Sequence, residues 1–117
     1  MSATERPALW HAWHQAGAIP RNIRLAVSAG ALLPLSLEQA VFERHGLKIH
    51  NFYGATECGG IAYDASETPR REESSVGRPL DQVRVEPGAH GALRVRSRAV
   101  GTTYWPRPEP ALGGGVF

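Results

Sequence analysis

Residues 23–53 read IRLAVSAGALLPLSLEQAVFERHGLKIHNFY, and this stretch decides the fold. Two mostly apolar segments, 23–27 and 47–53, have the composition of short strands, and residues 37–45 between them have the apolar spacing of a helix. A strand, a helix and a second strand within about 30 residues are typical of a βαβ unit, whose two strands lie parallel. The sequence therefore predicts an α/β fold in which these two strands are neighbours.

The ends of the predicted helix carry signals of their own. Ser36 and Gln39 have the spacing of a capping box, in which each side chain bonds a free backbone N–H of the first turn. Gly46 follows the last helical position and can adopt the left-handed conformation that commonly ends a helix. We expect the helix to be capped by Ser36 and to end at about His45.

Upstream of this unit, residues 8–16 predict a further short helix. Trp10 and Trp13 lie on an apolar stripe at helical spacing within it. Packing in a core is the favoured explanation for both side chains, and an aromatic binding surface is the alternative.

The sequence changes character after the second predicted strand. Residues 61–64 predict another short strand, and the polar, charged residues 65–75 predict an exposed loop. Segments 82–86 and 92–97 alternate apolar and polar residues on either side of a turn that contains Pro and Gly, which is typical of a β-hairpin.

These patterns predict an α/β fold class with a partial βαβ parallel sheet followed by a small β-rich subdomain built on the hairpin. We expect residues 1–64 to form the α/β part, residues 65–75 to form a linker loop and residues 76–117 to begin the β-rich subdomain. Residues 105–115 are dominated by Pro and Gly, so we expect them to be irregular.

Residues 51–60, NFYGATECGG, carry the main functional signal. In an open α/β sheet, ligands bind outside the carboxyl ends of the strands, and this segment begins where a predicted strand ends. Tyr53 offers a flat face for a base, and Gly54 lets the backbone come close to a ligand. Thr56 can donate a hydrogen bond to a phosphate oxygen, and Glu57 can bind Mg²⁺ through oxygen. The plainer alternative is a strand end with a glycine turn and a helix-capping threonine.

The motif Asn-x-Tyr-Gly-x-Thr-Glu is formed by Asn51, Tyr53, Gly54, Thr56 and Glu57. It resembles the signature of the acyl-adenylate-forming (AMP-binding) superfamily, which contains acyl-CoA synthetases, nonribosomal-peptide adenylation domains and luciferases. Flanking segments follow in the family's order: IRLAVSAGALLP before the motif, then VGRPL, GALRVRS and GTTYW after it. The resemblance covers nearly all of the chain.

The resemblance implies a two-step reaction in a complete enzyme. A carboxylate attacks the α-phosphate of ATP to form an acyl-adenylate, and a thiol such as coenzyme A or a carrier-protein pantetheine then takes the acyl group. ATP and Mg²⁺ are the implied cofactors, and coenzyme A is the implied co-substrate. Thr56 and Glu57 would be catalytic, with Glu57 as the metal ligand.

The resemblance also implies which residues surround the adenylate. The nucleotide would lie against Gly30, Ala31, Asn51, Tyr53, Gly54 and Thr56. Cys58, Gly59 and Gly60 would lie beside the acyl group of the substrate, with Cys58 as a small wall residue.

The chain also departs from the family pattern. Ala29 and Leu32 stand where the family more often has Gly and Pro, and the sequence contains neither a Ser/Thr/Gly-rich phosphate loop ending in Lys-Gly nor a Thr-Gly-Asp motif. We therefore expect an internal fragment of a larger ligase that is inactive alone. The alternative is a non-catalytic nucleotide-binding or protein-interaction module.

A fragment would leave apolar surface uncovered. We expect an exposed apolar patch on the helix that carries Trp10 and Trp13 and on the faces of strand 23–27. The chain could associate with itself through these faces.

Composition excludes several other functions. The net charge is +2, from 13 basic and 11 acidic residues that are scattered along the chain, so the basic stripe of a nucleic-acid-binding protein is absent. Cys58 is the only cysteine, which fits a reducing compartment. No apolar run approaches the roughly 20 residues that span a bilayer. We expect a cytoplasmic protein that binds small molecules.

Overall fold

The computed structural model describes residues 1–100, 115 and 116. These residues divide into two compact units, which we treat separately. Unit 1 contains residues 1–53 and 63–78, and unit 2 contains residues 54–62 and the described part of 79–117. The chain has a five-stranded sheet of order β1-β2-β3-β4-β5 and a two-stranded sheet of β6 and β7, so the predicted α/β fold class is confirmed.

The strands of unit 1 form two successive parallel pairs. β2 (Leu25–Ser28) lies between β1 (Ser2–Glu5) and β3 (Ile49–Ala55), with Ala26 in register with both Ala3 and Ile49. The helix α1 (Pro7–Ala16) connects β1 to β2, and α2 (Leu35–His45) connects β2 to β3. The predicted parallel pairing of the two central strands is confirmed, and β1 adds a second βαβ unit that the sequence patterns did not predict.

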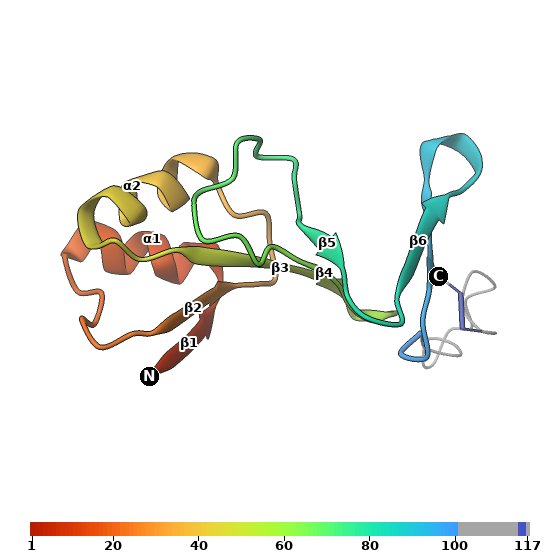
Figure 1. Ribbon diagram of the computed structural model, residues 1–117, viewed down its shortest axis with the longest axis horizontal. Helices are drawn as coiled ribbons and strands as arrows, with labels where there is room; N and C mark the ends of the chain where they lie inside the picture. The colour runs from red at the N-terminus through yellow and green to blue at the C-terminus, as the bar shows by residue number, and fades with distance from the viewer. Residues whose placement is uncertain (101–114, 117) are drawn as a thin grey trace. The chain divides into compact units, whose positions relative to one another are not determined.

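Both helices lie on one face of these three strands (Figure 1). Trp10 of α1 and Val41 of α2 are fully buried against Ala26 and Ile49 of the strands. The indole Nε1 of Trp10 also donates a hydrogen bond to the carbonyl oxygen of Val27 at 3.1 Å, which ties α1 to β2.

This packing corrects the prediction of an apolar patch on α1 and strand 23–27. Trp10 and Ala26 are 0% exposed and Ile23 is 8% exposed, while only Leu25 on this strand remains a large exposed apolar side chain, at 43%. The prediction was wrong because β1 was not foreseen. Its parallel pairing with β2 places α1 across the strands and covers the face that was expected to be open.

The capping of α2 also differs from the prediction. The helix begins at Leu35 after Pro34, so Ser36 lies inside the first turn and makes no capping hydrogen bond. The backbone N–H of Leu35 donates instead to Oε1 of Glu73 at 2.9 Å. The carboxyl end is as predicted, because Gly46 has a φ of 63° and its N–H donates to the carbonyl oxygen of Phe42.

The remaining strands are short. β4 (Gly59–Tyr63) and β5 (Arg78–Pro79) complete the larger sheet. In unit 2, β6 (Arg84–Pro87) pairs antiparallel with β7 (Leu93–Arg96), which confirms the predicted hairpin, and the short 3-10 helix η1 (Ala89–Gly91) lies between them. The prediction of irregular structure for 105–115 falls almost wholly outside the described residues.

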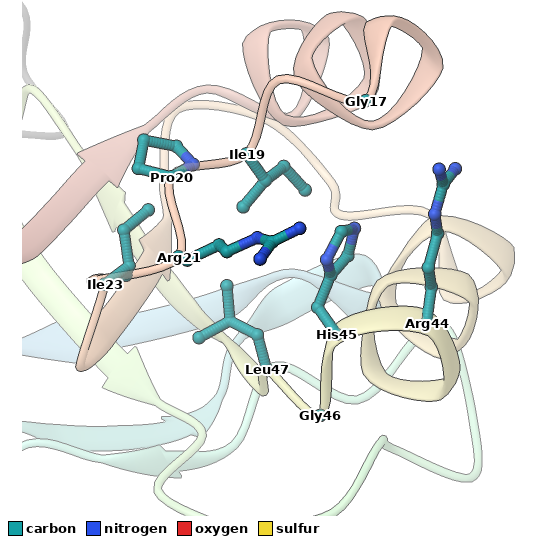
Figure 2. A pocket seen from close by; sticks show the side chains of 9 residues that line it. All are labelled: Gly17, Ile19, Pro20, Arg21, Ile23, Arg44, His45, Gly46 and Leu47. Carbon is teal, nitrogen blue, oxygen red and sulfur yellow. The ribbon is translucent and has the colours of Figure 1, made fainter.

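A cavity of about 510 Å³ lies in unit 1, where α1 and α2 end (Figure 2). Its lining residues precede β2 and β3 in the sequence, so the cavity lies at the amino-terminal edge of these strands. The candidate residues of unit 1 lie toward the carboxyl ends of the same strands, at the other edge.

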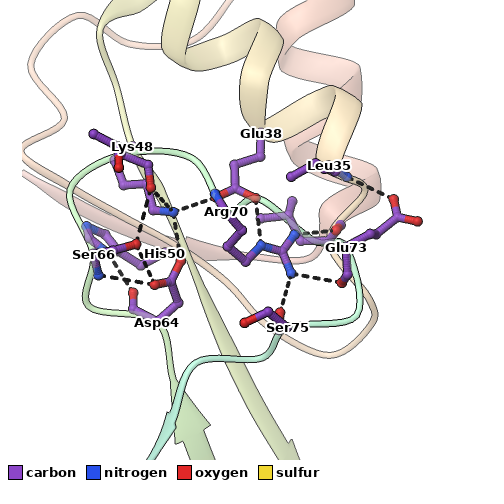
Figure 3. Close-up of polar contacts among 11 residues, drawn as sticks. Leu35, Glu38, Lys48, His50, Asp64, Ser66, Arg70, Glu73 and Ser75 are labelled. Carbon is purple, nitrogen blue, oxygen red and sulfur yellow. Dashed lines mark hydrogen bonds and ion pairs between the residues drawn. The ribbon is translucent and has the colours of Figure 1, made fainter.

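A buried group of four charged side chains holds the loop after β4 against α2 and β3 (Figure 3). We call Glu38, Lys48, Asp64 and Arg70 the charge cluster. The carboxylate of Glu38 is 0% exposed and pairs with both Lys48 and Arg70. Lys48 Nζ also lies 2.7 Å from Oδ2 of Asp64.

Most residues of the loop 65–75 are exposed, as expected, but the charge cluster buries Arg70 within it. Arg70 is 6% exposed, and its guanidinium donates to the carbonyl oxygens of Leu33 at 2.6 Å and Ser75 at 2.7 Å. Burial of such groups is tolerated only where charges and hydrogen bonds are matched. Arg70 therefore fastens the loop to unit 1, while most of its other residues remain exposed.

Candidate functional site

The candidate nucleotide-binding residues of unit 1 gather at the carboxyl ends of β2 and β3. Ser28, the last residue of β2, is in register with Asn51 of β3, and Tyr53 lies two residues further along β3. Side chains two residues apart on a strand share a face. Asn51 is 3% exposed and Tyr53 is 41% exposed, so Tyr53 presents its ring to solvent beyond a buried amide. Gly30 and Ala31 follow β2 at the same edge.

The backbone beneath Tyr53 is fixed by the charge cluster. The N–H of Asp64 donates to the carbonyl oxygen of Asn51 at 2.9 Å, and Nδ1 of His50 lies 2.9 Å from the carbonyl oxygen of Asp64. Burial alone would raise the pKa of Asp64, but hydrogen bonds from Lys48 and Ser66 hold the pKa below its ordinary value. The ionised carboxylate therefore holds Asp64 against Lys48, which directly precedes β3.

Ser28 supplies an unsatisfied polar group at the same edge. Its side chain is 0% exposed, and its Oγ has no hydrogen-bond partner among the described residues. A buried hydroxyl without a partner is destabilising by about 1–3 kcal/mol. A polar group of a bound ligand or a bound water would satisfy it, so the edge that holds Asn51 and Tyr53 suits a polar ligand.

Arg6 is a residue at this edge that the sequence analysis missed. It follows β1 directly, and its Cγ and Nε lie 3.5 Å from the position that a Cβ on Gly30 would occupy. Gly30 has a φ of 90°, which favours glycine, so the loop passes close to the arginine. Arg6 is exposed and places a positive charge beside the loop expected to contact the nucleotide. A prediction of β1 from the sequence would have placed Arg6 at this edge, because Arg6 directly follows that strand.

The candidate residues of unit 2 surround the turn between β3 and β4. The N–H of Cys58 donates to the carbonyl oxygen of Ala55 at 3.2 Å, which closes the turn around Thr56 and Glu57. A Cβ on Gly54 would lie 2.7 Å from the carbonyl oxygen of Gly59, so the two segments approach too closely for a side chain there. Gly60 follows in β4.

Thr56 is exposed and Glu57 is half-buried on this turn. Glu57 makes no ion pair with any residue that the structure describes. Its carboxylate is therefore free to accept a metal ion. In the described part of the chain, no three His, Cys, Asp or Glu side chains cluster to hold a metal. A lone carboxylate fits Mg²⁺, which commonly takes one or two protein carboxylates together with substrate phosphates and water.

Cys58 has the environment of a wall residue rather than of a nucleophile. It is 0% exposed, and burial together with the negative charge of Glu57 raises the pKa of its thiol. The thiolate is the reactive form of cysteine, and these surroundings suppress it.

Residues 3–105 match the family described as AMP-binding enzyme. The chain belongs to the AMP-binding enzyme family. This membership confirms the resemblance carried by the motif at Asn51–Glu57.

Two curated proteins are similar to this chain in sequence. The acyl-CoA ligase oryP of Aspergillus oryzae is 32% identical over 90 residues, which cover 74% of this chain and 16% of oryP. The uncharacterized acyl-CoA ligase YhfT of Bacillus subtilis is 31% identical over 62 residues, which cover 53% of this chain and 13% of YhfT. The matched stretches therefore cover less than one fifth of the length of either relative.

A solved AMP-binding structure shares the fold. A malonyl-CoA ligase in a ternary product complex with methylmalonyl-CoA and AMP superposes with a TM-score of 0.76 at 23% identity, over 97% of this chain and 29% of that one. Among the described residues of this chain, no helix has the length and apolar character needed to cross a membrane.

Proposed function

We propose that this chain carries adenine-, phosphate- and magnesium-binding residues of an acyl-adenylate-forming ligase. Membership of the AMP-binding family supports the reaction class. The single observation that carries the assignment is the arrangement at the end of β3. An exposed Tyr53 ring follows a buried Asn51, and the unsatisfied hydroxyl of Ser28 lies in register beside it.

In this proposal the unit 1 residues bind the base. The exposed ring of Tyr53 stacks on adenine. The side chain of Asn51 forms a hydrogen bond with the edge of the base. The hydrogen bond from Asp64 to the backbone of Asn51 keeps the strand in place, so little order has to be gained on binding. Gly30 and Ala31 leave room for the ligand because they lack large side chains.

The unit 2 residues contact the phosphates. The exposed hydroxyl of Thr56 donates to a phosphate oxygen, and Glu57 holds Mg²⁺. When bound, Mg²⁺ neutralises the charge that develops on pyrophosphate as it leaves. The acid substrate is a small carboxylate, and Cys58, Gly59 and Gly60 form its wall. Coenzyme A is the proposed acceptor, because both similar curated proteins are acyl-CoA ligases.

We further propose that the 117-residue chain binds ATP weakly and does not form an acyl-adenylate by itself. Lys48 is the only lysine, and it is buried in the charge cluster with Glu38 and Asp64, so its amine is not available to a reacting phosphate. Correct positioning of the reactants can lower the activation free energy by roughly 7–11 kcal/mol. The proposed residues form only one wall of the site, so they supply only part of this reduction.

Calorimetric titration with ATP and Mg²⁺ tests the binding residues. Tyr53→Ala should abolish measurable binding, whereas Tyr53→Phe keeps the ring and should bind like the wild type. Glu57→Gln should weaken binding only when Mg²⁺ is present, and Glu67→Gln, an exposed control, should change nothing. Equal affinity of Tyr53→Ala and the wild type for ATP would show that the nucleotide does not bind at this edge.

Carboxylate-dependent exchange of labelled pyrophosphate into ATP tests the second part of the proposal. We expect no exchange above background with aliphatic acids, aromatic acids or amino acids. Turnover by the pure chain that disappears in Glu57→Gln would show that the chain is a sufficient ligase.

A further inference from the structure

None of the residues proposed to bind the nucleotide lines the cavity at the amino-terminal edge of β2 and β3. Its volume is about 510 Å³, within the range of small-molecule sites. The lining comes from two stretches, 17–23 and 44–47, that bring the ends of α1 and α2 together.

Three basic side chains line this cavity. Figure 2 shows Arg21 extending across it toward the ring of His45, with Arg44 at the end of α2 beside them. Nη2 of Arg44 lies 3.8 Å from the position of a Cβ on Gly17, so Arg44 reaches the end of α1. Within the described residues, neither arginine has an ion-pair partner, because the ion pairs of unit 1 involve only the charge cluster.

A helix dipole explains part of this arrangement. Basic residues in the last turn of a helix offset its partial negative charge, and Arg44 and His45 occupy that position in α2. Arg21 lies in the connection between α1 and β2, so a helix dipole does not explain its position. All three basic residues are exposed, so solvent screens their mutual repulsion, and an anion among them would be attracted to each of them.

The pKa of His45 responds first to burial and then to the neighbouring positive charges. Burial and the positive charges of Arg44, His14 and Arg21 lower the pKa of His45 below its ordinary value. An anion in the cavity would oppose these effects and raise the pKa.

Apolar side chains form the smaller part of the cavity wall. Ile19 and Ile23 are 6% and 8% exposed, and Leu47 is half-buried beside them. A ligand that fills the space therefore has an apolar part as well as an anionic one.

We propose that this cavity is a second ligand site, which binds a phosphate monoester that carries a small apolar group. The planar guanidinium groups of Arg21 and Arg44 match the oxygens of a phosphate, and a doubly charged anion suits several basic groups better than a single carboxylate. The apolar group covers Ile19 and Leu47. The site is independent of the proposed adenylate chemistry, because its residues lie at the opposite edge of the strands.

Titration of the ¹⁵N-labelled 117-residue chain with phenyl phosphate, followed by amide NMR spectra, tests the proposal. The amide signals of Gly17, His45 and Gly46 should move in a saturable way, and those of Gly30 and Tyr53 should stay in place. Phenyl phosphate should bind more tightly than inorganic phosphate or phenol, because only it offers both the charge and the apolar group.

Charge-removing variants of exposed residues give the matched comparison. Arg21→Gln and Arg44→Gln should each weaken binding of phenyl phosphate about three- to fivefold, as expected for exposed charge pairs. Arg24→Gln removes the same charge from an exposed position outside the cavity and should leave the affinity unchanged. The spectra of the free variants show directly whether each one is folded.

Three results would overturn the proposal. The first is a shift pattern centred on Gly30 and Tyr53 or spread over all basic residues. The second is equal binding by the wild type, Arg21→Gln and Arg44→Gln. The third is a pKa of His45 that saturating phenyl phosphate leaves unchanged.

Discussion

The Nε atom of Arg70 lies 2.7 Å from Oε2 of Glu38, although 32 residues separate them in sequence and both side chains are buried. The backbone N–H of Arg70 donates to the other carboxylate oxygen of Glu38 at 3.0 Å. One side chain of α2 therefore binds both the backbone and the guanidinium of the loop that follows β4. This pair makes the stability of unit 1 depend on a carboxylate that looks like a surface residue in the sequence.

Glu38→Gln should strongly destabilise unit 1. The change leaves Lys48 and Arg70 buried with one partner fewer, and removing one member of a buried ion pair typically costs about 3–5 kcal/mol. Glu43→Gln, which removes an exposed carboxylate from the same helix, is the control and should lie within about 0.5 kcal/mol of the wild type. Urea unfolding monitored by circular dichroism measures both; similar midpoints would contradict the role of the charge cluster.

Asp64→Asn should flatten the acid dependence of stability. The pKa of Asp64 is lowered in the folded chain, so its contribution is present above the ordinary pKa of an aspartate and is lost as the pH falls through the folded-state value. The free-energy difference between the wild type and Asp64→Asn should therefore shrink as the pH falls from about 6 to about 2. Unfolding curves over that range measure it, and a constant difference would rule out a stabilising role of the ionised carboxylate.

Gly77→Ala should be far more damaging than Gly46→Ala. Both glycines have positive φ, 92° and 63°, so each alanine carries a conformational cost of about 1–2 kcal/mol. A Cβ at Gly77 would also lie 2.3 Å from the backbone of Tyr63, whereas nothing lies within 4 Å at Gly46. We expect at least twice the loss of unfolding free energy for Gly77→Ala. Equal losses would mean that the backbone at Tyr63 moves freely.

Arg6→Gln should weaken ATP binding about threefold, since an exposed cation beside Gly30 would attract a phosphate through solvent-screened charge. Arg24→Gln is the matched control in the same unit. The difference should shrink when sodium chloride is added, because salt screens exposed charges. If both variants bind ATP equally, Arg6 has no part in the nucleotide site.

The central βαβ unit could be predicted because its signals are local. The apolar periodicity of α2, the glycine after it and the strand-like segments on either side are all properties of neighbouring residues. β1 was missed because its sequence, SATE, is polar and its residues are exposed or half-buried, as suits a strand at the edge of a sheet. The core packing favoured for Trp10 is confirmed, and the missed strand explains why an exposed patch on its helix was wrongly expected.

The contacts that join distant segments could not be predicted. Ser36 fits a capping box by spacing, but the first N–H of α2 is taken by Glu73, which lies 38 residues away. The meeting of Glu38, Lys48 and Arg70 could not be predicted because nothing near them in sequence indicates it. The motif at 51–57 located the candidate site, while Ser28 and Arg6 entered it only through strand pairing and loop packing. The roles assigned to these residues stay predictions.

Burial of Lys48 has a practical consequence for chemical labelling. It is the only lysine in the sequence, and its amine lies within the charge cluster, 2.7 Å from Asp64. The terminal amine of Met1 is exposed and becomes the one amine that a reagent such as a succinimidyl ester can reach in the folded chain. A second label added per molecule would report that the cluster has opened, so mass spectrometry of the labelled protein would count opening events without a probe having to be engineered into it.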